Sequence, residues 1–307
     1  NEISWTRSLK QRFERFQSLS FKTDRLYIGM YRPFTKKYFY YDPDWTDQQY
    51  KMSIVFPTQL SENILLSLSN KTEGKELTCL AIDLLPDVNL FAGGSQNLPE
   101  FLYDNLGKYS SIRESILNNF NSLTADSVLP YIYGIFHSKE YKMKYFADLS
   151  KEFPRIPNLK NKEKFINVGR KLMDLHLNYE EVPIYDDVEI QLSVQPSYKV
   201  TKMKFVKKRD ENGKLVNDRS TIIYNNDITI SNIPEKAYQY VVNGRSAIEW
   251  IMDQYQVKTD KKSGITDDPN DYSTDDKYIF NLLLRIINVS MQTVDLINSL
   301  PKFEVEE

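Results

Sequence analysis

Residues able to perform acid–base, nucleophilic or thiolate chemistry are few in this sequence. His137 and His176 are its two histidines, and Cys79 is its single cysteine. The histidines lie too far apart for H-E-x-x-H, and one cysteine permits neither an intrachain disulfide nor a thiolate metal cluster. A Ser-His-Asp triad stays open, because its members need not be neighbours in sequence. Each histidine lies on a helix-like stretch among apolar residues, so we expect two structural histidines and a buried, apolar Cys79.

One pair of carboxylates could hold a metal ion. Pro43-Asp44 is followed, after 28 intervening residues, by Glu73-Gly74-Lys75, a loose form of the P-D…E-x-K pattern of metal-dependent nucleases. In this interpretation Asp44 and Glu73 bind Mg²⁺ and Lys75 helps to activate water. Charged residues make up 27% of the chain, so such a short pattern arises easily by chance. A nuclease is therefore an alternative hypothesis.

The glycines and prolines exclude several catalytic motifs. No two of the ten glycines have the spacing of the dinucleotide-binding motif G-x-G-x-x-G, of the P-loop or of the nucleophile elbow. No two of the thirteen prolines are adjacent, which removes the Pro-Pro signature of amino-methyltransferases. The chain therefore lacks the sequence signals of nucleotide hydrolysis and of adenine methylation.

Basic residues offer a different chemistry, the binding of phosphates. The formal charge is only −2, yet the charges are sorted along the chain. Residues 7–37 carry nine basic and two acidic side chains, residues 139–171 carry ten and four, and residues 198–209 carry six and none. Acidic residues gather in 180–189, 260–276 and 304–307. Such sorting predicts a positive and a negative face, although each run could also be a solvated surface.

The elements that must position these residues form a mixed pattern. The 307 residues suggest about two domains or one large one. Residue spacing predicts an amphipathic helix within 1–25, helices at 112–123, 139–150 and 161–178, and closing helices at 245–255 and 274–300. One further helix is expected after a cap at 124–126, with Leu129, Ile132, Tyr133 and Phe136 as its apolar stripe. Strands are predicted at 25–31, 37–41, 63–69, 77–83, 89–92, 188–195, 199–207, 215–224 and 227–230, with a hairpin turn at 211–214.

This order predicts an α+β fold, with a β-rich N-terminal part, a central helical part, a second β-rich part and closing C-terminal helices. The β-rich N-terminal part is expected at 26–108, after a helical start at 1–25. The helical part is expected at 109–180, and the second β-rich part with the closing helices at 181–307. Mean hydropathy is −0.52 and no long uncharged apolar run occurs, so we expect no transmembrane helix and no membrane partner. The chain starts at Asn1 without a methionine or a signal-like segment, so we expect a piece of a longer protein.

Four stretches together resemble a known family. They are residues 30–41 (MYRPFTKKYFYY), 131–141 (YIYGIFHSKEY) with 153–157 (FPRIP), 169–180 (GRKLMDLHLNYE), and 243–265 (NGRSAIEWIMDQYQVKTDKKSGI) with 268–270 (DPN). In this order they are similar to the C-terminal specificity region of type ISP restriction–modification enzymes. Those bacterial proteins join a nuclease, a helicase-like translocase, an adenine methyltransferase and a target recognition domain in one chain.

The resemblance implies a function for the whole chain as one target recognition region. It would bind double-stranded DNA for an upstream adenine-N6 methyltransferase domain of the same cytoplasmic protein, with residues 1–25 as a helical junction to that domain. It would hold no catalytic residue, no metal and no cofactor. S-adenosylmethionine, ATP and Mg²⁺ would be used elsewhere in the parent enzyme. A purely interdomain scaffold is a further alternative, because aromatic residues in 1–41 could pack on neighbouring domains.

Candidate contact residues follow from this implied function and from the charge pattern. Phosphates require cations, and base edges require Arg, Lys, Asn or Gln. The basic hairpin of the second β-rich block could enter a groove, and two other places carry exposed-looking cations. The expected DNA-binding residues are Lys202, Lys204, Lys207, Lys208, Arg209, Lys214, Arg219, Arg155, Lys258 and Lys261. The expected interdomain residues are Trp5, Arg7, Phe13 and Arg32.

Overall fold

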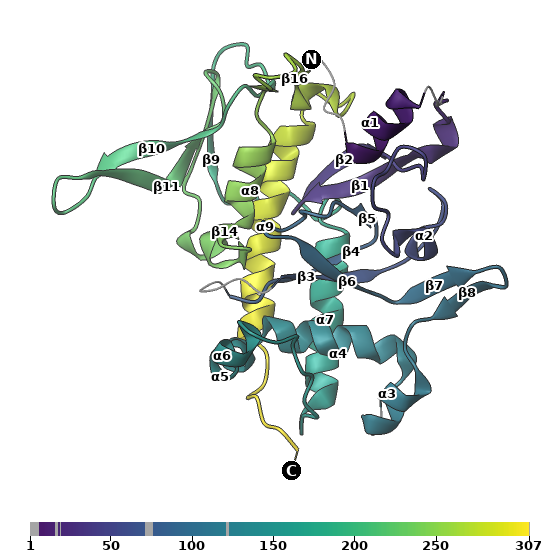
Figure 1. The fold of residues 1–307 in the computed structure, drawn as a ribbon. Coiled ribbons are helices and arrows are strands. Elements are labelled where there is room, and N and C mark those ends of the chain that lie inside the picture. Colours follow the sequence, from purple (N-terminus) through teal and green to yellow (C-terminus); the bar gives the residue numbers. More distant parts are fainter. Residues whose placement is uncertain (1–5, 16–17, 19, 71–75, 121–122, 307) are drawn as a thin grey trace. The chain divides into compact units, whose positions relative to one another are not determined.

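The computed structural model describes residues 6–15, 18, 20–70, 76–120 and 123–306 (Figure 1). The chain divides into two compact units. The first comprises Asn1–Leu177 and Ser299–Glu307, and the second comprises Asn178–Asn298. The helical segment 109–180 and the β-rich segment 26–108 thus share the first unit almost completely. The C-terminal residues return to that unit rather than staying with the second.

The strands of the first unit form small antiparallel sheets. One sheet has the order β2 (Thr35–Tyr40), β1 (Leu26–Arg32), β5 (Leu85–Pro86), in which only the β1–β5 pairing is parallel. Another has the order β4 (Cys79–Ile82), β3 (Leu65–Ser69), β6 (Ser95–Pro99). Every residue of β3 and β4 is buried, including Ser67 and Ser69, which alternate with leucines along β3. The strands β7 (Phe101–Asp104) and β8 (Gly107–Ser110) form a separate hairpin.

Two helices form the core of the first unit, α4 (Ala125–His137) and α7 (Lys162–Leu177). They cross closely because glycine lies at the contact on each helix. A Cβ atom on Gly169 would lie 1.9 Å from the carbonyl oxygen of Pro130, and one on Gly134 would lie 2.4 Å from that of Phe165. Thr124 and Ser127 form a capping box that begins α4, within the segment where a helix cap is expected.

Shorter helices and the C-terminal segment complete this unit. The C-terminal segment lies against it through Phe303, whose ring packs on Tyr141 and Phe165, and through an ion pair of 3.0 Å between Lys162 and Glu306. The remaining helices are α1 (Arg7–Glu14), α2 (Met52–Val55), α3 (Glu114–Asn119), α5 (Lys139–Lys144) and α6 (Phe146–Leu149), with the 3₁₀ turn η1 (Thr23–Arg25).

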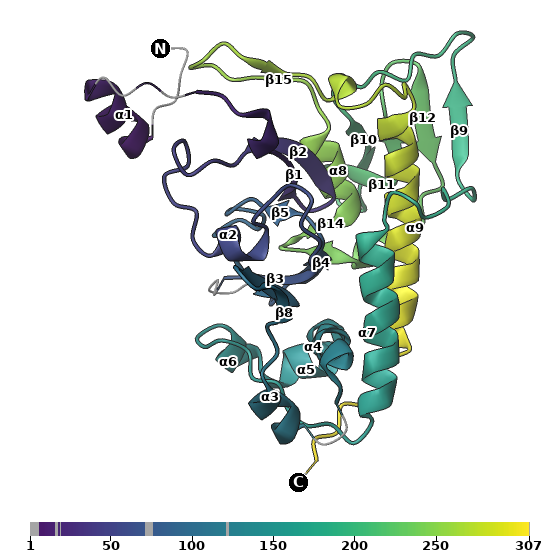
Figure 2. The ribbon, with the colours of Figure 1, turned by 90° about the vertical axis from the view of Figure 1, so that its right-hand side faces the viewer.

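The second unit contains a four-stranded antiparallel sheet (Figure 2). Its strand order is β10 (Lys204–Arg209), β11 (Leu215–Ile223), β12 (Ile228–Ser231), β9 (Glu189–Leu192). Helix α8 (Ala247–Gln254) begins with a Ser246–Glu249 capping box and packs against α9 (Tyr278–Asn298). The smaller elements are β13 (Val241–Val242), β14 (Arg245–Ser246), β15 (Lys258–Thr259), β16 (Thr266–Asp267), η2 (Glu235–Gln239) and η3 (Pro269–Asp271).

Among the described residues, α9 is the one helix long and apolar enough to cross a membrane by length and composition. From the sequence we expect no segment to meet these two criteria for a transmembrane helix, and α9 meets both. However, 61% of its most apolar 18-residue window is buried inside the protein. That burial is typical of a core helix in a folded domain.

The expected α+β fold is confirmed, and four expected elements differ in detail. The strand expected at 199–207 begins only at Lys204, because residues 199–203 are irregular. Residues 89–92 form a turn instead of a strand, because Asp87 accepts the N–H of Asn89 in an Asx turn and Leu90 and Phe91 are both fully buried. Within the helix expected at 112–123, residues Glu114–Asn119 form α3, and residues 121–122 lie outside the described residues. The helix expected at 139–150 is divided into α5 and α6 at Tyr145.

Candidate nucleic-acid interface

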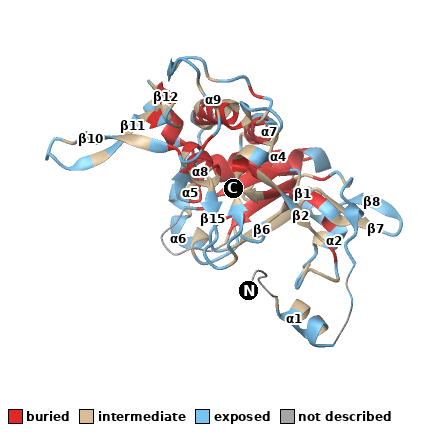
Figure 3. Ribbon diagram, turned by 90° about the horizontal axis from the view of Figure 1, so that it is seen from above, coloured by how far each residue is buried: buried red, intermediate tan, exposed pale blue. Residues whose placement is uncertain are grey.

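A two-stranded β-ribbon, formed by β10 and β11, projects from the sheet of the second unit (Figure 1). β12 pairs with β11 only at Ile222 and Ile223, so residues 206–218 have no further strand beside them. All residues in this distal part are exposed or half-buried, in contrast to the buried core helices (Figure 3). A two-stranded ribbon of this kind fits the major groove of B-DNA.

The tip of the ribbon is a tight, hydrogen-bonded turn. The Asp210 carboxylate accepts the N–H of Asn212 at 3.0 Å and of Lys214 at 2.8 Å. Gly213 has a φ of 74°, in the left-handed region that favours glycine. The hairpin turn predicted from the sequence is thereby confirmed, and the tip is fixed by its own side chains.

The ribbon cations divide between two faces. Lys207 and Arg209 lie two residues apart on β10 and therefore share one face, together with their cross-strand partners Asn217 and Leu215. Lys207 Nζ donates to Asn217 Oδ1, and Arg209 Nη1 donates to the Gly213 carbonyl at 2.8 Å. This face presents two cations and one amide to solvent.

The opposite face is closer to neutral. Lys208 Nζ lies 3.1 Å from Asp218 Oδ1. A hydrogen bond from the Ser220 hydroxyl, together with the Lys208 ammonium, lowers the pKa of Asp218, which therefore stays ionised near neutral pH. Lys208 is thus the one cation of the distal ribbon that has a carboxylate partner among the described residues.

Arg219 anchors the ribbon to the body of the second unit. The register of β10 and β11 shifts after Val206–Asp218, so Arg219, Ser220 and Thr221 form a bulge. The Arg219 guanidinium lies 3.2 Å from Glu249 Oε1 and 5.4 Å from the Tyr238 ring centroid. These contacts indicate that Arg219 orients the ribbon, whereas Lys207 and Arg209 are exposed and donate hydrogen bonds within the ribbon itself.

A pocket of about 400 Å³ lies at the base of the ribbon. Lys202 and Lys204, both expected to bind DNA, line it together with Lys199, which the sequence analysis did not select. Lys199 belongs to the basic run 198–209, and that run is the signal that could have identified it. The structure therefore brings Lys202 and Lys204 into one site and adds a third lysine.

The other expected DNA contacts lie apart from the ribbon. Lys258 begins the β15–β16 hairpin and donates to the Asp253 carbonyl at 2.7 Å, and Lys261 is exposed in the loop of that hairpin. Val257 N–H donates to the Thr201 carbonyl at 3.0 Å, so this hairpin starts beside the pocket segment. Arg155 belongs to the first unit, is 89% exposed and pairs with Glu152 at 3.0 Å.

The expected interdomain residues lie in the first unit. Trp5 is outside the described residues. Arg7 is exposed at the start of α1, and Phe13 on the same helix is 67% exposed. Arg32 pairs with Asp87 at 2.9 Å and stacks on Tyr31 at 3.9 Å, so it has partners within its own unit. A role of these residues between domains stays a prediction.

The structure gives no support to the nuclease alternative. Asp44 lies 3.1 Å from Arg12 and 3.6 Å from Lys22, so its charge is already balanced by two cations. Glu73 and Lys75 lie outside the described residues. Among the residues that the structure does describe, no three His, Cys, Asp or Glu side chains come together as a metal site.

Both histidines are structural, as expected. Tyr133 OH accepts the Ala81 N–H at 3.1 Å and lies 2.6 Å from His176 Nδ1, and His137 Nδ1 donates to the Tyr133 carbonyl at 2.8 Å. Burial lowers the pKa of His137 to about 3 and that of His176 well below its usual value, so both rings are neutral. Cys79 is buried, and burial raises the pKa of its thiol, which makes it a poor nucleophile.

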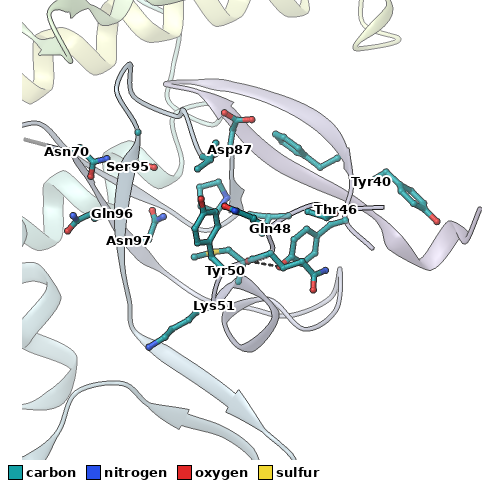
Figure 4. Close-up of a pocket in the computed structure, with 18 residues that line it drawn as sticks. Tyr40, Thr46, Gln48, Tyr50, Lys51, Asn70, Asp87, Ser95, Gln96 and Asn97 are labelled. Carbon is teal, nitrogen blue, oxygen red and sulfur yellow. Dashed lines mark hydrogen bonds between the residues drawn. The ribbon is translucent and has the colours of Figure 1, made fainter. Parts of the chain in front are cut away.

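The first unit has a pocket of its own, about 660 Å³ in volume (Figure 4). Tyr40, Tyr50 and Gln48 lie on one side of it, and Asn70 and Ser95 on the other. Asn70 Oδ1 and Ser95 Oγ are buried and have no hydrogen-bond partner among the described residues. None of the expected DNA-binding residues lines this pocket. Most of them lie instead on the ribbon or at its base.

Almost the whole chain is similar to a known family and to several solved structures. The family model of the type ISP C-terminal specificity domain matches residues 1–282. The ATP-dependent type ISP restriction–modification enzyme LlaBIII bound to DNA has 55% sequence identity and a TM-score of 0.92, over 99% of this chain and 20% of that one. A nuclease-deletion mutant of the type ISP enzyme LlaGI, in complex with a DNA substrate mimic, has 47% identity and a TM-score of 0.87, over 99% and 23%.

A third solved structure has lower sequence identity but also matches almost the whole of this chain. The DrdV–DNA complex has 26% identity and a TM-score of 0.85, over 99% of this chain and 31% of that one. No curated protein matches the sequence. This chain spans between about a fifth and a third of the length of these three proteins. The family match over residues 1–282 confirms the resemblance seen in the sequence: the chain belongs to the type ISP C-terminal specificity domain family.

Proposed function

We propose that this chain recognises the DNA target sequence for a type ISP restriction–modification enzyme, with the β10–β11 ribbon in the major groove. The observation that carries the proposal is an exposed, cationic two-stranded ribbon in a member of a specificity-domain family. The three similar structures are described as complexes with DNA or with a DNA substrate mimic. A ribbon with both faces open can approach base edges without moving the rest of the unit.

The ribbon face with Lys207, Arg209 and Asn217 has the chemistry to read bases. Arg and Lys donate to the O6 and N7 acceptors of guanine, and Asn pairs with the N6 and N7 positions of adenine. The intrachain bonds of these side chains are exposed, so they can exchange for bonds to a base edge. Lys208, already paired with Asp218, would contribute charge near the backbone instead.

The chemistry of the parent enzyme would lie in other parts of its chain. S-adenosylmethionine, ATP and Mg²⁺ would be used there, and the similar enzyme LlaBIII is described as ATP-dependent. The partner of this unit would be an upstream adenine-N6 methyltransferase domain, with α1 and its exposed Phe13 on the junction. Because bacterial DNA lies in the cytoplasm, the enzyme would act there.

Selection from a pool of randomised duplexes tests this function. The chain should enrich one sequence, and Lys207→Ala/Lys208→Ala/Arg209→Ala should lose most of that preference. If the three residues contact phosphates or bases, each good base contact should account for about 1–3 kcal/mol of discrimination. A charge-matched control, Lys10→Ala/Lys51→Ala/Lys302→Ala, removes three exposed lysines of the first unit. Enrichment of the same sequence with equal affinity by both triple variants would contradict the assignment of the ribbon.

A further inference from the structure

The pocket at the base of the ribbon is built by an irregular segment and by the β11–β12 turn. Lys204 is the first residue of β10 and Ile223 is the last of β11, so the pocket opens where the ribbon leaves the sheet. The polar side chains that line it are those of Ser197, Lys199, Thr201, Lys202, Lys204, Asn225, Asn226 and Asp227. Its volume of about 400 Å³ exceeds what one water molecule needs.

The segment that carries two of these lysines is held rigidly from both sides. Asn225 Nδ2 donates to the carbonyls of Ser197 and Lys199, and Tyr224 OH donates to the carbonyl of Tyr198. Asn270 binds Val200 through both its amide oxygen and its amide nitrogen. The side chains of Val200 and Met203 are buried, which leaves Lys199 and Lys202 on the outside. The lysine backbones are therefore fixed before any ligand binds.

The pocket lysines have no anionic partner among the described residues, unlike four of the eight other candidate cations. Lys208, Arg219, Lys258 and Arg155 each have an ion pair within the described residues, whereas Lys199, Lys202 and Lys204 have none. Asp227 is the single carboxylate of the pocket, and it accepts Ser193 Oγ and the Ser197 N–H, both at 3.1 Å. Three like charges on a rigid frame repel one another, and a bound anion would remove that repulsion.

From these observations we infer that the pocket binds a phosphodiester group of the DNA backbone. The inference rests on the proposed function, because it requires the ribbon to lie in the adjacent groove. Ammonium groups and the hydroxyls of Ser197 and Thr201 suit the two free oxygens of a phosphodiester. The pocket offers no aromatic surface for a base, so it suits the backbone rather than a free nucleotide.

This assignment gives the base and the distal part of the β10–β11 ribbon different roles in DNA binding. Phosphate contacts set the register of a protein on the duplex, and base contacts specify the sequence. A phosphate held beside Lys204 would fix how far the ribbon enters the groove, since Lys204 and Lys207 belong to the same strand. The pocket would then supply affinity and register, and the distal ribbon would supply discrimination.

A scan with neutral methylphosphonate linkages tests the inference. The probe is the duplex enriched by the chain, with one phosphate at a time replaced. At one or two neighbouring positions the neutral linkage should weaken binding by about tenfold, as the loss of a charge-assisted hydrogen bond does. Lys199→Gln/Lys202→Gln/Lys204→Gln should bind the unmodified duplex more weakly and should no longer respond at those positions. Lys302→Gln, an exposed lysine of the first unit, should respond like the original chain.

The outcomes separate this inference from the proposed function. The pocket variant could enrich the same sequence and still bind more weakly wherever a neutral linkage weakens binding of the original chain. In that case the pocket holds no phosphate and the ribbon assignment survives. If no duplex is enriched by the original chain, the proposed function fails and the inference fails with it. Lost sensitivity in the pocket variant, with unchanged sequence preference and unchanged thermal stability, supports both. The slope of log K against log salt should then fall by about 0.9 for each phosphate released.

Discussion

The α4–α7 core of the first unit and the β10–β11 ribbon of the second use polar side chains in opposite ways. In the core, Tyr133, His137 and His176 are buried, bonded to one another or to backbone, and uncharged. On the ribbon, Lys207 and Arg209 are exposed, charged and bonded only through contacts that water or a ligand can replace. Burial therefore determines whether a polar side chain stabilises the fold or remains available to bind a ligand.

This difference predicts that substitutions in the core change stability and that substitutions on the ribbon change binding. Gly169→Val should have the largest effect, because its Cβ would meet the Pro130 carbonyl at 1.9 Å and force the helices apart. We expect a loss of more than about 3 kcal/mol in the free energy of unfolding, measured with urea. Gly213→Ala at the ribbon tip is the matched control, with a φ of 74° but nothing within 4 Å of the new Cβ. It should cost only about 1 kcal/mol. Equal losses in the two variants would break the comparison.

The buried histidines predict a pH dependence that the ribbon does not share. The pKa of His137 is lowered to about 3 in the folded protein, against about 6.5 when the ring is exposed. The unfolded chain therefore takes up the proton first as the pH falls, so stability is complete above about pH 6.5 and declines below it. Between pH 7 and pH 5 the decline should be about 2 kcal/mol from this residue.

His176 shifts in the same direction and should steepen the decline. His137→Asn keeps a donor for the Tyr133 carbonyl and should flatten the curve of unfolding free energy against pH between 7 and 5. An unchanged slope in this variant would show that other groups cause the dependence. The carboxylates with lowered pKa values, such as Asp218, titrate at lower pH and should leave this window unaffected.

The smallest expected effect on stability is that of the ribbon triple variant. Lys207→Ala/Lys208→Ala/Arg209→Ala removes exposed side chains that contact only the ribbon itself. The free energy of unfolding should change by less than about 0.5 kcal/mol, although DNA binding should be strongly reduced. A loss of stability comparable to that of Gly169→Val would mean that the ribbon supports the fold.

Local patterns in the sequence determined much of this protein. Helical spacing predicted α4, α7, α8 and α9, and the residues around Gly213 predicted the hairpin turn, because caps, turns and periodicity act over a few residues. Four sequence stretches indicated the family, and the basic run 198–209 indicated the region of the ribbon. All of these signals are read within short windows of the chain.

Tertiary structure decided which of these residues act together. Lys162 pairs with Glu306, 144 residues away, so the C-terminal segment joins the first unit although it follows the second in sequence. Asn225 and Asn270 bind the segment around Lys199 and bring three lysines into one pocket. The ion pair of Arg219 with Glu249 gives that arginine a structural role that its charge did not reveal. Such contacts join residues 26 or more positions apart, and side-chain packing in three dimensions determines them.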